Sequence, residues 1–157
     1  HQMTNASIYN VMSHQNIIAA FLVLMRGDKI LLLKRHNTGY HDGDYSLIAG
    51  HVDQGETFTE TIIREAKEEA GIIVQPQHLQ VVHVMHRKSR VDKSERVDVY
   101  FLAKKWSGQI TNQEPEKCCE LKWFALHKLP TNLIGSVRQA IEAVVNKIPY
   151  SEVGWRE

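Results

Sequence analysis

Residues 57–71 constrain the fold more than any other part of the sequence, because both ends and one face of a helix can be read from them. Thr57, followed three residues later by Glu60, forms a capping-box pattern that starts a helix. Gly71 stands where a helix ends on a residue in the left-handed conformation. The sequence therefore predicts a helix over residues 57–70 with one buried face. Its apolar stripe consists of Ile62, Ile63, Ala66 and Ala70.

Three carboxylates lie on this helix, directly beside the apolar stripe. At about 100° per residue, Glu68 and Glu69 fall within roughly 60° of Glu65, one on each side. Like charges at this spacing repel by roughly 0.2–0.5 kcal/mol per pair, and Arg64 relieves only part of that repulsion. An exposed acidic face is the ordinary interpretation, but this stripe borders the buried face and follows a Gly-bracketed acidic segment, residues 50–56. A hard divalent cation such as Mg²⁺, which takes oxygen ligands, would remove the repulsion.

The rest of the sequence predicts strands interspersed with one more helix. Apolar runs at residues 17–25 and 29–35 flank a Gly-Asp turn and predict a hairpin. Apolar spacing over residues 134–147 predicts an amphipathic helix that Pro149 stops. This mixture is typical of an α/β or α+β sandwich. The other predicted strands cover residues 46–49, 79–88, 97–104 and 121–126.

Composition is that of an ordinary globular domain. The chain has 157 residues and a net charge of +1, so we expect one domain over residues 17–157 behind a polar lead-in, residues 1–16. We interpret residues 1–2 as a tag remnant before a natural start at Met3. The near-neutral charge argues against binding nucleic acid by bulk charge. No run approaches the ~18 apolar residues of a membrane span, and the polar start does not resemble a secretory signal.

The two cysteines, Cys118 and Cys119, are adjacent in the sequence. Neighbouring residues on a strand point to opposite faces, so a disulfide between them would be strained. We therefore predict reduced thiols and a cytoplasmic protein.

Residues 50–72 match the signature of a known family. The Nudix hydrolase box reads G-x5-E-x7-R-E-U-x-E-E-x-G-U, where U is aliphatic, and every fixed position is present. The chain therefore resembles the MutT-like Nudix hydrolases. Many of these have a Pro-Gly-Gly run where this chain has Ala49, Gly50 and His51, which weakens a direct assignment to the oxidised-nucleotide subgroup. The matching fixed residues are Gly50, Glu56, Arg64, Glu65, Glu68, Glu69 and Gly71.

The resemblance implies a Nudix-type α/β/α sandwich around a mixed β-sheet. It also implies hydrolysis of a nucleoside diphosphate linked to another moiety, X. The expected cofactor is Mg²⁺, with Mn²⁺ as a substitute. By position in the box, the expected metal ligands are Glu65, Glu68, Glu69 and the carbonyl group of Ala49.

The resemblance gives supporting roles to further residues. Glu65 is a candidate general base, Glu56 is expected to assist the metal site and tether the loop, and Arg64 should orient a box carboxylate. Many members add a carboxylate from a loop outside the box, and residues 112–118 resemble that loop. We favour Glu114 for this role, although a solvated acidic loop is the plain alternative. The other candidates are Glu120, as the second choice, and Glu116.

Candidate substrate contacts lie near the box. Tyr40 and Tyr45 stand in or beside the loop that leads to it, so we expect them to line the cleft. Arg35, at the end of a predicted strand, could contact a phosphate. A basic cluster around residues 89–96 is interpreted as a solvated rim, with a phosphate guide or an RNA 5′-end contact as the alternative. Its members are Arg87, Lys88, Arg90, Lys93 and Arg96.

The sequence therefore predicts a pyrophosphohydrolase that converts a nucleoside or deoxynucleoside triphosphate into the monophosphate and pyrophosphate. Its partner would be a small nucleotide, with no membrane contact, and a homodimer is compatible with what is common in the family. Alternatives are hydrolysis of ADP-ribose, of a nucleotide sugar or of an RNA 5′ end, and isomerase chemistry on a diphosphate. A non-catalytic nucleotide-binding regulator is a further alternative, which the intact box carboxylates disfavour.

Overall fold

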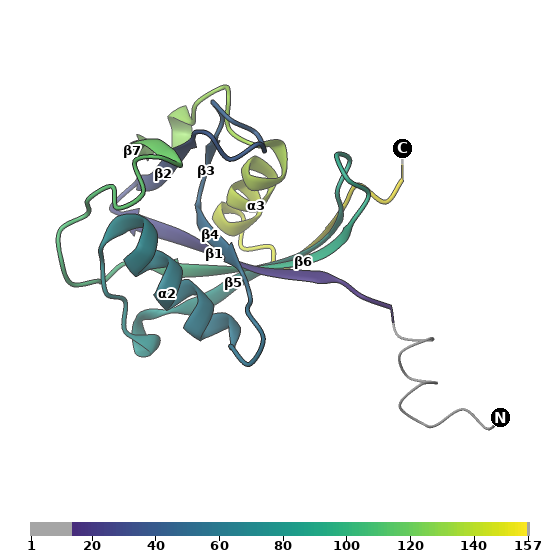
Figure 1. Ribbon diagram of the computed structural model, residues 1–157, viewed down its shortest axis with the longest axis horizontal. Coiled ribbons are helices and arrows are strands. Elements are labelled where there is room, and N and C mark those ends of the chain that lie inside the picture. The colour runs from purple at the N-terminus through teal and green to yellow at the C-terminus, as the bar shows by residue number, and fades with distance from the viewer. Residues whose placement is uncertain (1–13, 157) are drawn as a thin grey trace.

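The computed structural model describes residues 14–156, which form a mixed eight-stranded sheet covered by helices (Figure 1). The strands are β1 (Ile17–Arg26), β2 (Lys29–Arg35), β3 (Tyr45–Ser46), β4 (Ile48–His51), β5 (Gln80–Lys88), β6 (Glu95–Ala103), β7 (Cys118–Ala125) and β8 (Tyr150–Val153). The helices are α2 (Phe58–Ala70) and α3 (Gly135–Val145), with short 3-10 turns η1 (Pro76–His78) and η2 (Leu126–Lys128). The main strand order is β3-β2-β1-β6-β5-β8, while β4 pairs with β1 and β7 pairs with β2.

Strand β1 joins the two parts of the sheet. It runs parallel to β6 along most of its length and antiparallel to β4. The predicted hairpin with β2 is confirmed, with Gly27 at φ 60° in the turn. Only two residue pairs of β1 and β2 align beside this turn before the strands separate. Beyond the turn, β2 pairs with β7 and β3 instead of β1, so β1 and β2 diverge into different parts of the sheet.

The two helices cover opposite faces of the sheet, which confirms the predicted α/β/α sandwich (Figure 1). On one face, Ile62 and Ala66 of α2 pack on Leu22 and its neighbours. On the other face, Val137 and Ile141 of α3 pack with a second cluster. Because β1 is covered on both faces, its sequence is a continuous apolar run rather than an alternating one.

Two details of the predicted secondary structure are wrong. The single strand expected at residues 46–49 is two strands, β3 and β4, because the chain changes pairing partner at the buried Leu47. The sequence also gave no signal for β8, a four-residue strand that lies parallel to β5 at the edge of the sheet. Its residues are half exposed, and so short an edge strand lacks a periodic apolar pattern.

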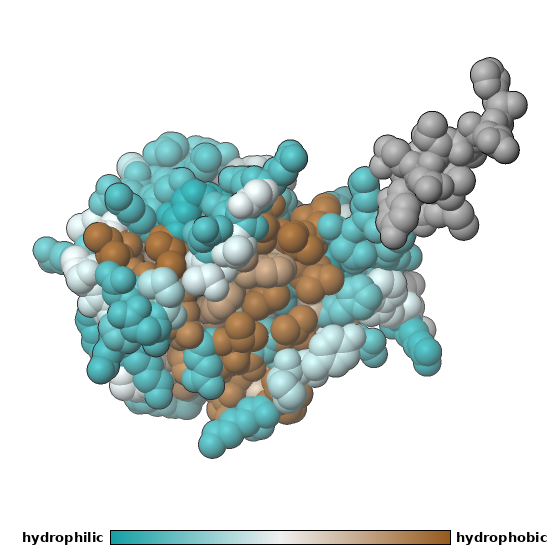
Figure 2. All heavy atoms as spheres, turned by 90° about the horizontal axis from the view of Figure 1, so that it is seen from below, coloured by the Kyte–Doolittle hydropathy of each residue, from teal (hydrophilic) through white to brown (hydrophobic). Residues whose placement is uncertain are grey.

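Other expectations can be compared directly with the structure. The two cysteines are free, with Cys118 buried and Cys119 exposed, as strand alternation predicts. Within residues 14–156, no helix is long and apolar enough to cross a bilayer. Most of the predicted lead-in, including the tag remnant, lies outside the described residues. Figure 2 shows hydrophobic residues gathered in the middle of the lower face, with hydrophilic residues around them.

Candidate metal and nucleotide site

Helix α2 is fixed at both ends by the features that its sequence predicts. The Thr57 hydroxyl accepts a hydrogen bond from the Glu60 N–H at 3.1 Å, and the Thr57 N–H donates to the Glu60 carboxylate at 2.8 Å. At the other end, Gly71 has φ 68°, and its N–H donates to the Lys67 carbonyl at 3.0 Å. These caps fix the start and the end of the helix, and therefore the direction in which its carboxylates project.

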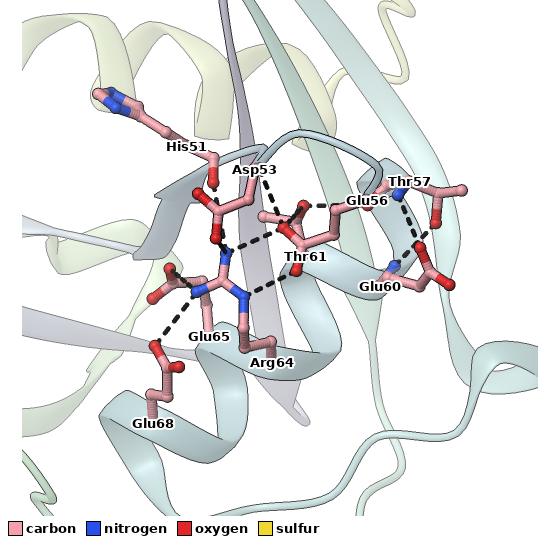
Figure 3. A network of polar contacts seen from close by, with 9 residues as sticks. All are labelled: His51, Asp53, Glu56, Thr57, Glu60, Thr61, Arg64, Glu65 and Glu68. Atoms are coloured by element: carbon pink, nitrogen blue, oxygen red, sulfur yellow. Dashed lines mark hydrogen bonds and ion pairs between the residues drawn. The ribbon is translucent and has the colours of Figure 1, made fainter.

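Arg64 connects the carboxylates at the start of the box (Figure 3). Its Nε and one terminal nitrogen donate to the two oxygens of Glu56 at 2.8 and 3.0 Å. Its other terminal nitrogen donates to Glu65 at 2.8 Å and to Glu68 at 3.2 Å. It also forms an ion pair with Asp53 at 3.4 Å. Arg64 therefore takes the orienting position expected of it, but it contacts four carboxylates rather than one.

Glu56 ties the loop before α2 to the helix itself. Besides Arg64, it accepts hydrogen bonds from the Thr61 hydroxyl at 2.6 Å and from the Asp53 N–H at 3.2 Å. The hydrogen bonds from Arg64, followed by the one from Thr61, lower the pKa of Glu56 to about 2. This geometry agrees with the tethering role expected for Glu56, since the ionised carboxylate bridges the loop and the helix (Figure 3).

Glu65 and Glu69 are the two box carboxylates whose pKa values are raised. The Glu65 carboxylate lies against Gly50, where an added Cβ would come within 2.0 Å of Oε1. Glu69 accepts a hydrogen bond from the Ala49 N–H at 3.1 Å. Burial, followed by the charge of Glu65, raises the pKa of Glu69 well above its ordinary value, and burial also raises the pKa of Glu65. Both shifts have burial as their largest cause, and Arg64 offsets part of the shift at Glu65.

These carboxylates open into a cleft of about 430 Å³. Glu114 reaches the same cleft from the loop before β7, and its charge contributes to the raised pKa of Glu65 and of Glu69. The structure therefore brings the predicted loop carboxylate to the box. The opposite walls carry cations and neutral polar groups. The full lining consists of Leu33, Arg35, Asn37, Thr38, Glu65, Glu68, Glu69, Glu114, Lys117 and Cys118.

The two other loop carboxylates do not line this cleft. Glu116 is exposed on the outside of the loop. Glu120 lies beside Tyr45, whose pKa burial and the Glu120 carboxylate raise, and Lys122 Nζ is 4.0 Å from Glu120. Glu116 lies in the loop before β7, whereas Glu120 lies on β7 itself, opposite Lys34 of β2. The three glutamates lie close together in the sequence, and only the fold shows that Glu114 is the one that lines this cleft.

A second hollow, of about 340 Å³, adjoins the cleft through Arg35, which lines both. Arg35 Nε donates to the Tyr40 carbonyl at 2.6 Å, and its guanidinium lies 5.3 Å from the centre of the Tyr40 ring. Tyr40 therefore lines the hollow, as expected of a substrate contact. The other lining residues include Phe21, Ile134 and Val137, which are apolar, and His51, Ser136, Arg87 and Arg96, which are polar.

The expectation that Tyr45 lines the cleft is not met in the structure. Tyr45 is 7% exposed and lies in the core cluster beneath α3. Its ring packs edge-on against Phe124 at 5.0 Å, and it lines neither hollow. The reason is strand alternation: β3 turns Tyr45 toward the core, whereas the preceding loop leaves Tyr40 at the rim.

The basic cluster around residues 89–96 divides in two. Arg90 is exposed, as a solvated rim requires. Arg87 is 8% exposed and Arg96 is half buried, and both line the second hollow. Arg87 forms an ion pair with Asp98, a residue that the sequence reasoning missed. An aspartate inside the apolar strand β6 was the available signal, because unpaired aspartate is almost never fully buried.

The donor set of the cleft fits a divalent cation. Every candidate ligand is an oxygen, the preferred donor of Mg²⁺, and a cation would offset the burial that raises the pKa values of Glu65 and Glu69. Within residues 14–156, no three acidic, thiol or imidazole groups converge closely enough to hold one ion as they stand. Arg64 instead holds Glu65 and Glu68. The Ala49 N–H faces Glu69, and the role of the Ala49 carbonyl as a ligand stays a prediction.

Comparison with known proteins agrees with this geometry. A crystal structure titled as a MutT NUDIX hydrolase from Burkholderia pseudomallei superposes with a TM-score of 0.75 and 29% identity, covering 82% of this chain and 98% of that one. An ADP-ribose pyrophosphatase from Methanocaldococcus jannaschii is 31% identical over 69% of this chain and 61% of its own length. A NAD-capped RNA hydrolase NudC from Mannheimia succiniciproducens is 35% identical over 78% of this chain and 45% of its own length.

The chain thus spans about half the length of these curated relatives. The profile of the NUDIX domain matches residues 15–144, which include the box, both hollows and most of the sheet. This match covers far more than half of the sequence. The chain therefore belongs to the NUDIX domain family.

Proposed function

We propose that this chain is a Mg²⁺-dependent pyrophosphohydrolase, with Mn²⁺ as a substitute, which cleaves the diphosphate of a nucleoside diphosphate linked to X. The favoured substrate is a nucleoside or deoxynucleoside triphosphate, and the products are the monophosphate and pyrophosphate. One observation carries the proposal: a cleft with four carboxylates shares Arg35 with a second hollow that has apolar and aromatic walls. A small nucleotide in the cytoplasm is the partner that these two sites would serve.

In such a reaction, different residues of the cleft would bind the metal and the diphosphate. The carboxylates of Glu65, Glu68 and Glu69 would hold the metal, which neutralises diphosphate oxygens and acidifies a water when it is bound. Arg35 and Lys117 line the cleft as well, where their cationic groups would contact the diphosphate. Binding on these groups would orient the diphosphate and exclude bulk water.

A carboxylate must accept the proton of the attacking water. Glu65 and Glu114 are the candidates, because both line the cleft. They also lie close enough together for the charge of Glu114 to contribute to the raised pKa of Glu65. Burial raises the pKa of Glu65 in the metal-free protein, so its carboxylate is more basic there than that of an exposed glutamate. Arg64 would have to release Glu65 or Glu68 as a cation arrives, so it acts as a counter-ion that positions these groups in the metal-free protein.

ADP-ribose is the second candidate substrate. The observation that favours it is the 31% identity to the ADP-ribose pyrophosphatase of M. jannaschii. Hydrolysis of this compound would use the same cleft for its diphosphate and the second hollow for one of its ends. Nucleotide sugars and RNA 5′ ends would be handled in the same way.

A panel of nucleotides with products identified by chromatography tests the proposal. We expect Mg²⁺-dependent release of a nucleoside monophosphate from at least one compound, and loss of this activity on addition of EDTA. Glu68→Gln and Glu69→Gln should each lower kcat by about 100-fold or more, because they remove metal ligands. Glu142→Gln, on the exposed side of α3, is the matched control. Full activity in both box variants, or no release from any compound, would refute the proposal.

The loop carboxylate is tested by a second pair of variants. Glu114→Gln should lower kcat, because its side chain lines the cleft. Glu120→Gln should not, because Glu120 lies beside Tyr45 and Lys122 instead. The opposite pattern would assign the role to Glu120.

A further inference from the structure

Arg87, which lines the second hollow, forms a buried ion pair that the proposed reaction does not use. Arg87 of β5 is 8% exposed, and its Nε donates to Oδ2 of Asp98, a residue of β6 that is fully buried. Among residues 14–156, Asp98 is the only hydrogen-bond partner of the Arg87 guanidinium. Because Arg87 also lines the hollow, the donors on its terminal nitrogens are available to a molecule that enters.

Two residues behind the wall of the hollow, Asp98 and Tyr100, have unmet hydrogen-bonding capacity. The second oxygen of Asp98 and the hydroxyl of Tyr100 are both buried and have no hydrogen-bond partner in the described part of the chain. Both residues lie on the face of β6 that meets Phe21, whose ring stacks on that of Tyr100 at 4.6 Å. A buried ion pair with unused capacity is a poor source of stability, because desolvation offsets its attraction. The arrangement is therefore better explained by recognition than by folding.

The remaining walls suit a flat ring. Phe21, Tyr40, Ile134 and Val137 provide apolar and aromatic surface around a volume of about 340 Å³. Small-molecule sites of ~300–1,000 Å³ commonly combine such walls with a few polar groups that fix orientation. Arg87 is the most deeply buried charged group among the lining residues, so its contact with a ring edge would be the best shielded from water.

We propose that Arg87 is a specificity-determining residue, which selects bases that present a carbonyl oxygen over bases that present an amino group. A guanidinium has donors and no acceptor. A carbonyl oxygen on the ring edge would accept from Arg87, whereas an amino group would place donor against donor. Asp98 is the positioning residue that holds the guanidinium toward the hollow. This inference rests on the proposed function, because the hollow serves the substrate of the adjoining cleft.

Inosine and adenosine triphosphates form the sharpest probe pair, because they differ only in the oxygen or amino group at C6 and the protonation of the adjacent ring nitrogen. We expect kcat/KM to be about 10- to 100-fold higher for inosine triphosphate, the range that one well-formed side-chain contact to a base edge provides. Arg87→Lys keeps the charge beside Asp98 but loses the planar fork, so the preference should fall to about threefold or less. Arg90→Lys, an exposed neighbour, is the matched control and should keep the preference.

Asp98→Asn tests the positioning role. It removes the negative charge that holds the Arg87 guanidinium, while the side chain keeps nearly the same shape. The preference for inosine triphosphate should therefore fall, because KM for this substrate rises while kcat stays nearly unchanged. A purely structural role for Asp98 would instead lower the melting temperature and affect both substrates equally. Should these single variants unfold, the double variant Arg87→Met/Asp98→Leu removes the whole pair without leaving an unpaired charge, and it should also lose the preference.

Binding separates failure of this inference from failure of the proposed function. Inosine and adenosine monophosphates are titrated into the metal-free protein by calorimetry. Tighter binding of inosine monophosphate, lost in Arg87→Lys, supports the inference even if no nucleotide is hydrolysed. Equal affinities in the unaltered protein, an adenine preference, no binding of either, or a preference that survives in Arg87→Lys would each overturn it.

Discussion

Gly50→Ala should disable the proposed metal site while leaving the fold intact. Gly50 lies on β4, and its α-carbon faces the Glu65 side chain of α2. An added Cβ would lie 2.0 Å from Oε1, 2.3 Å from Cδ and 2.7 Å from Cγ of Glu65. The methyl group and the Glu65 carboxylate therefore cannot occupy their positions together.

The size of the effect follows from these distances. Contacts of a real Cβ essentially never fall below 3.0 Å, so Oε1 must move by about 1 Å or more. A misplacement of about 1 Å in a catalytic group can cost roughly 100-fold in rate. Stability should change little, because a new rotamer costs roughly 0.5–1.5 kcal/mol and alanine in a strand regains roughly 0.5–1 kcal/mol over glycine.

Steady-state kinetics at several Mg²⁺ concentrations, together with the melting temperature, would measure both effects. Gly50→Ala should lower kcat by about 100-fold and raise the Mg²⁺ concentration needed for half-maximal rate. Gly135→Ala is the matched control, because no atom lies within 4 Å of the Cβ that it would add. The reasoning is refuted if Gly50→Ala keeps both the rate and the Mg²⁺ dependence of the unaltered protein.

Three further predictions concern stability. Thr57→Ala removes the capping box and should cost about 1 kcal/mol, seen as a lower melting temperature that Thr57→Ser largely restores; no change would contradict the cap. Ile141→Ala leaves a cavity in the core under α3, where Ile141 is 2% exposed. It should lower the free energy of unfolding, measured with denaturant, by about 2–5 kcal/mol. A loss below about 1 kcal/mol would contradict this, because it would mean that the surrounding side chains fill the cavity. The pKa of Glu56 is lowered from 4.5 to about 2, so its ionised form stabilises the fold above pH 4.5 and this contribution disappears as the pH falls toward 2. Glu56→Gln should therefore flatten the acid decline of the melting temperature, and an equally steep decline would count against the tether.

Much of the site could be predicted from the sequence because its determinants are local. The caps of α2, the spacing of its carboxylates and the left-handed Gly71 all depend on residues within one helix. Local patterns also predicted the turn between β1 and β2 and the two helices. They could not separate Glu114 from Glu120, since Glu114 lies in the loop before β7 and Glu120 lies on β7, whose pairing with β2 is a long-range contact.

The sequence by itself determined the family, the α/β/α layers and the set of box carboxylates, because a fixed spacing along a helix fixes which residues share its face. Only the tertiary structure decided that Tyr40 reaches the second hollow while Tyr45 packs in the core. It also decided that Arg87 is buried and pairs with Asp98 instead of lying on the exposed basic rim, since that pairing depends on the register of β5 against β6. Contacts between strands far apart in the chain have no local signature, and the second hollow is built from such contacts.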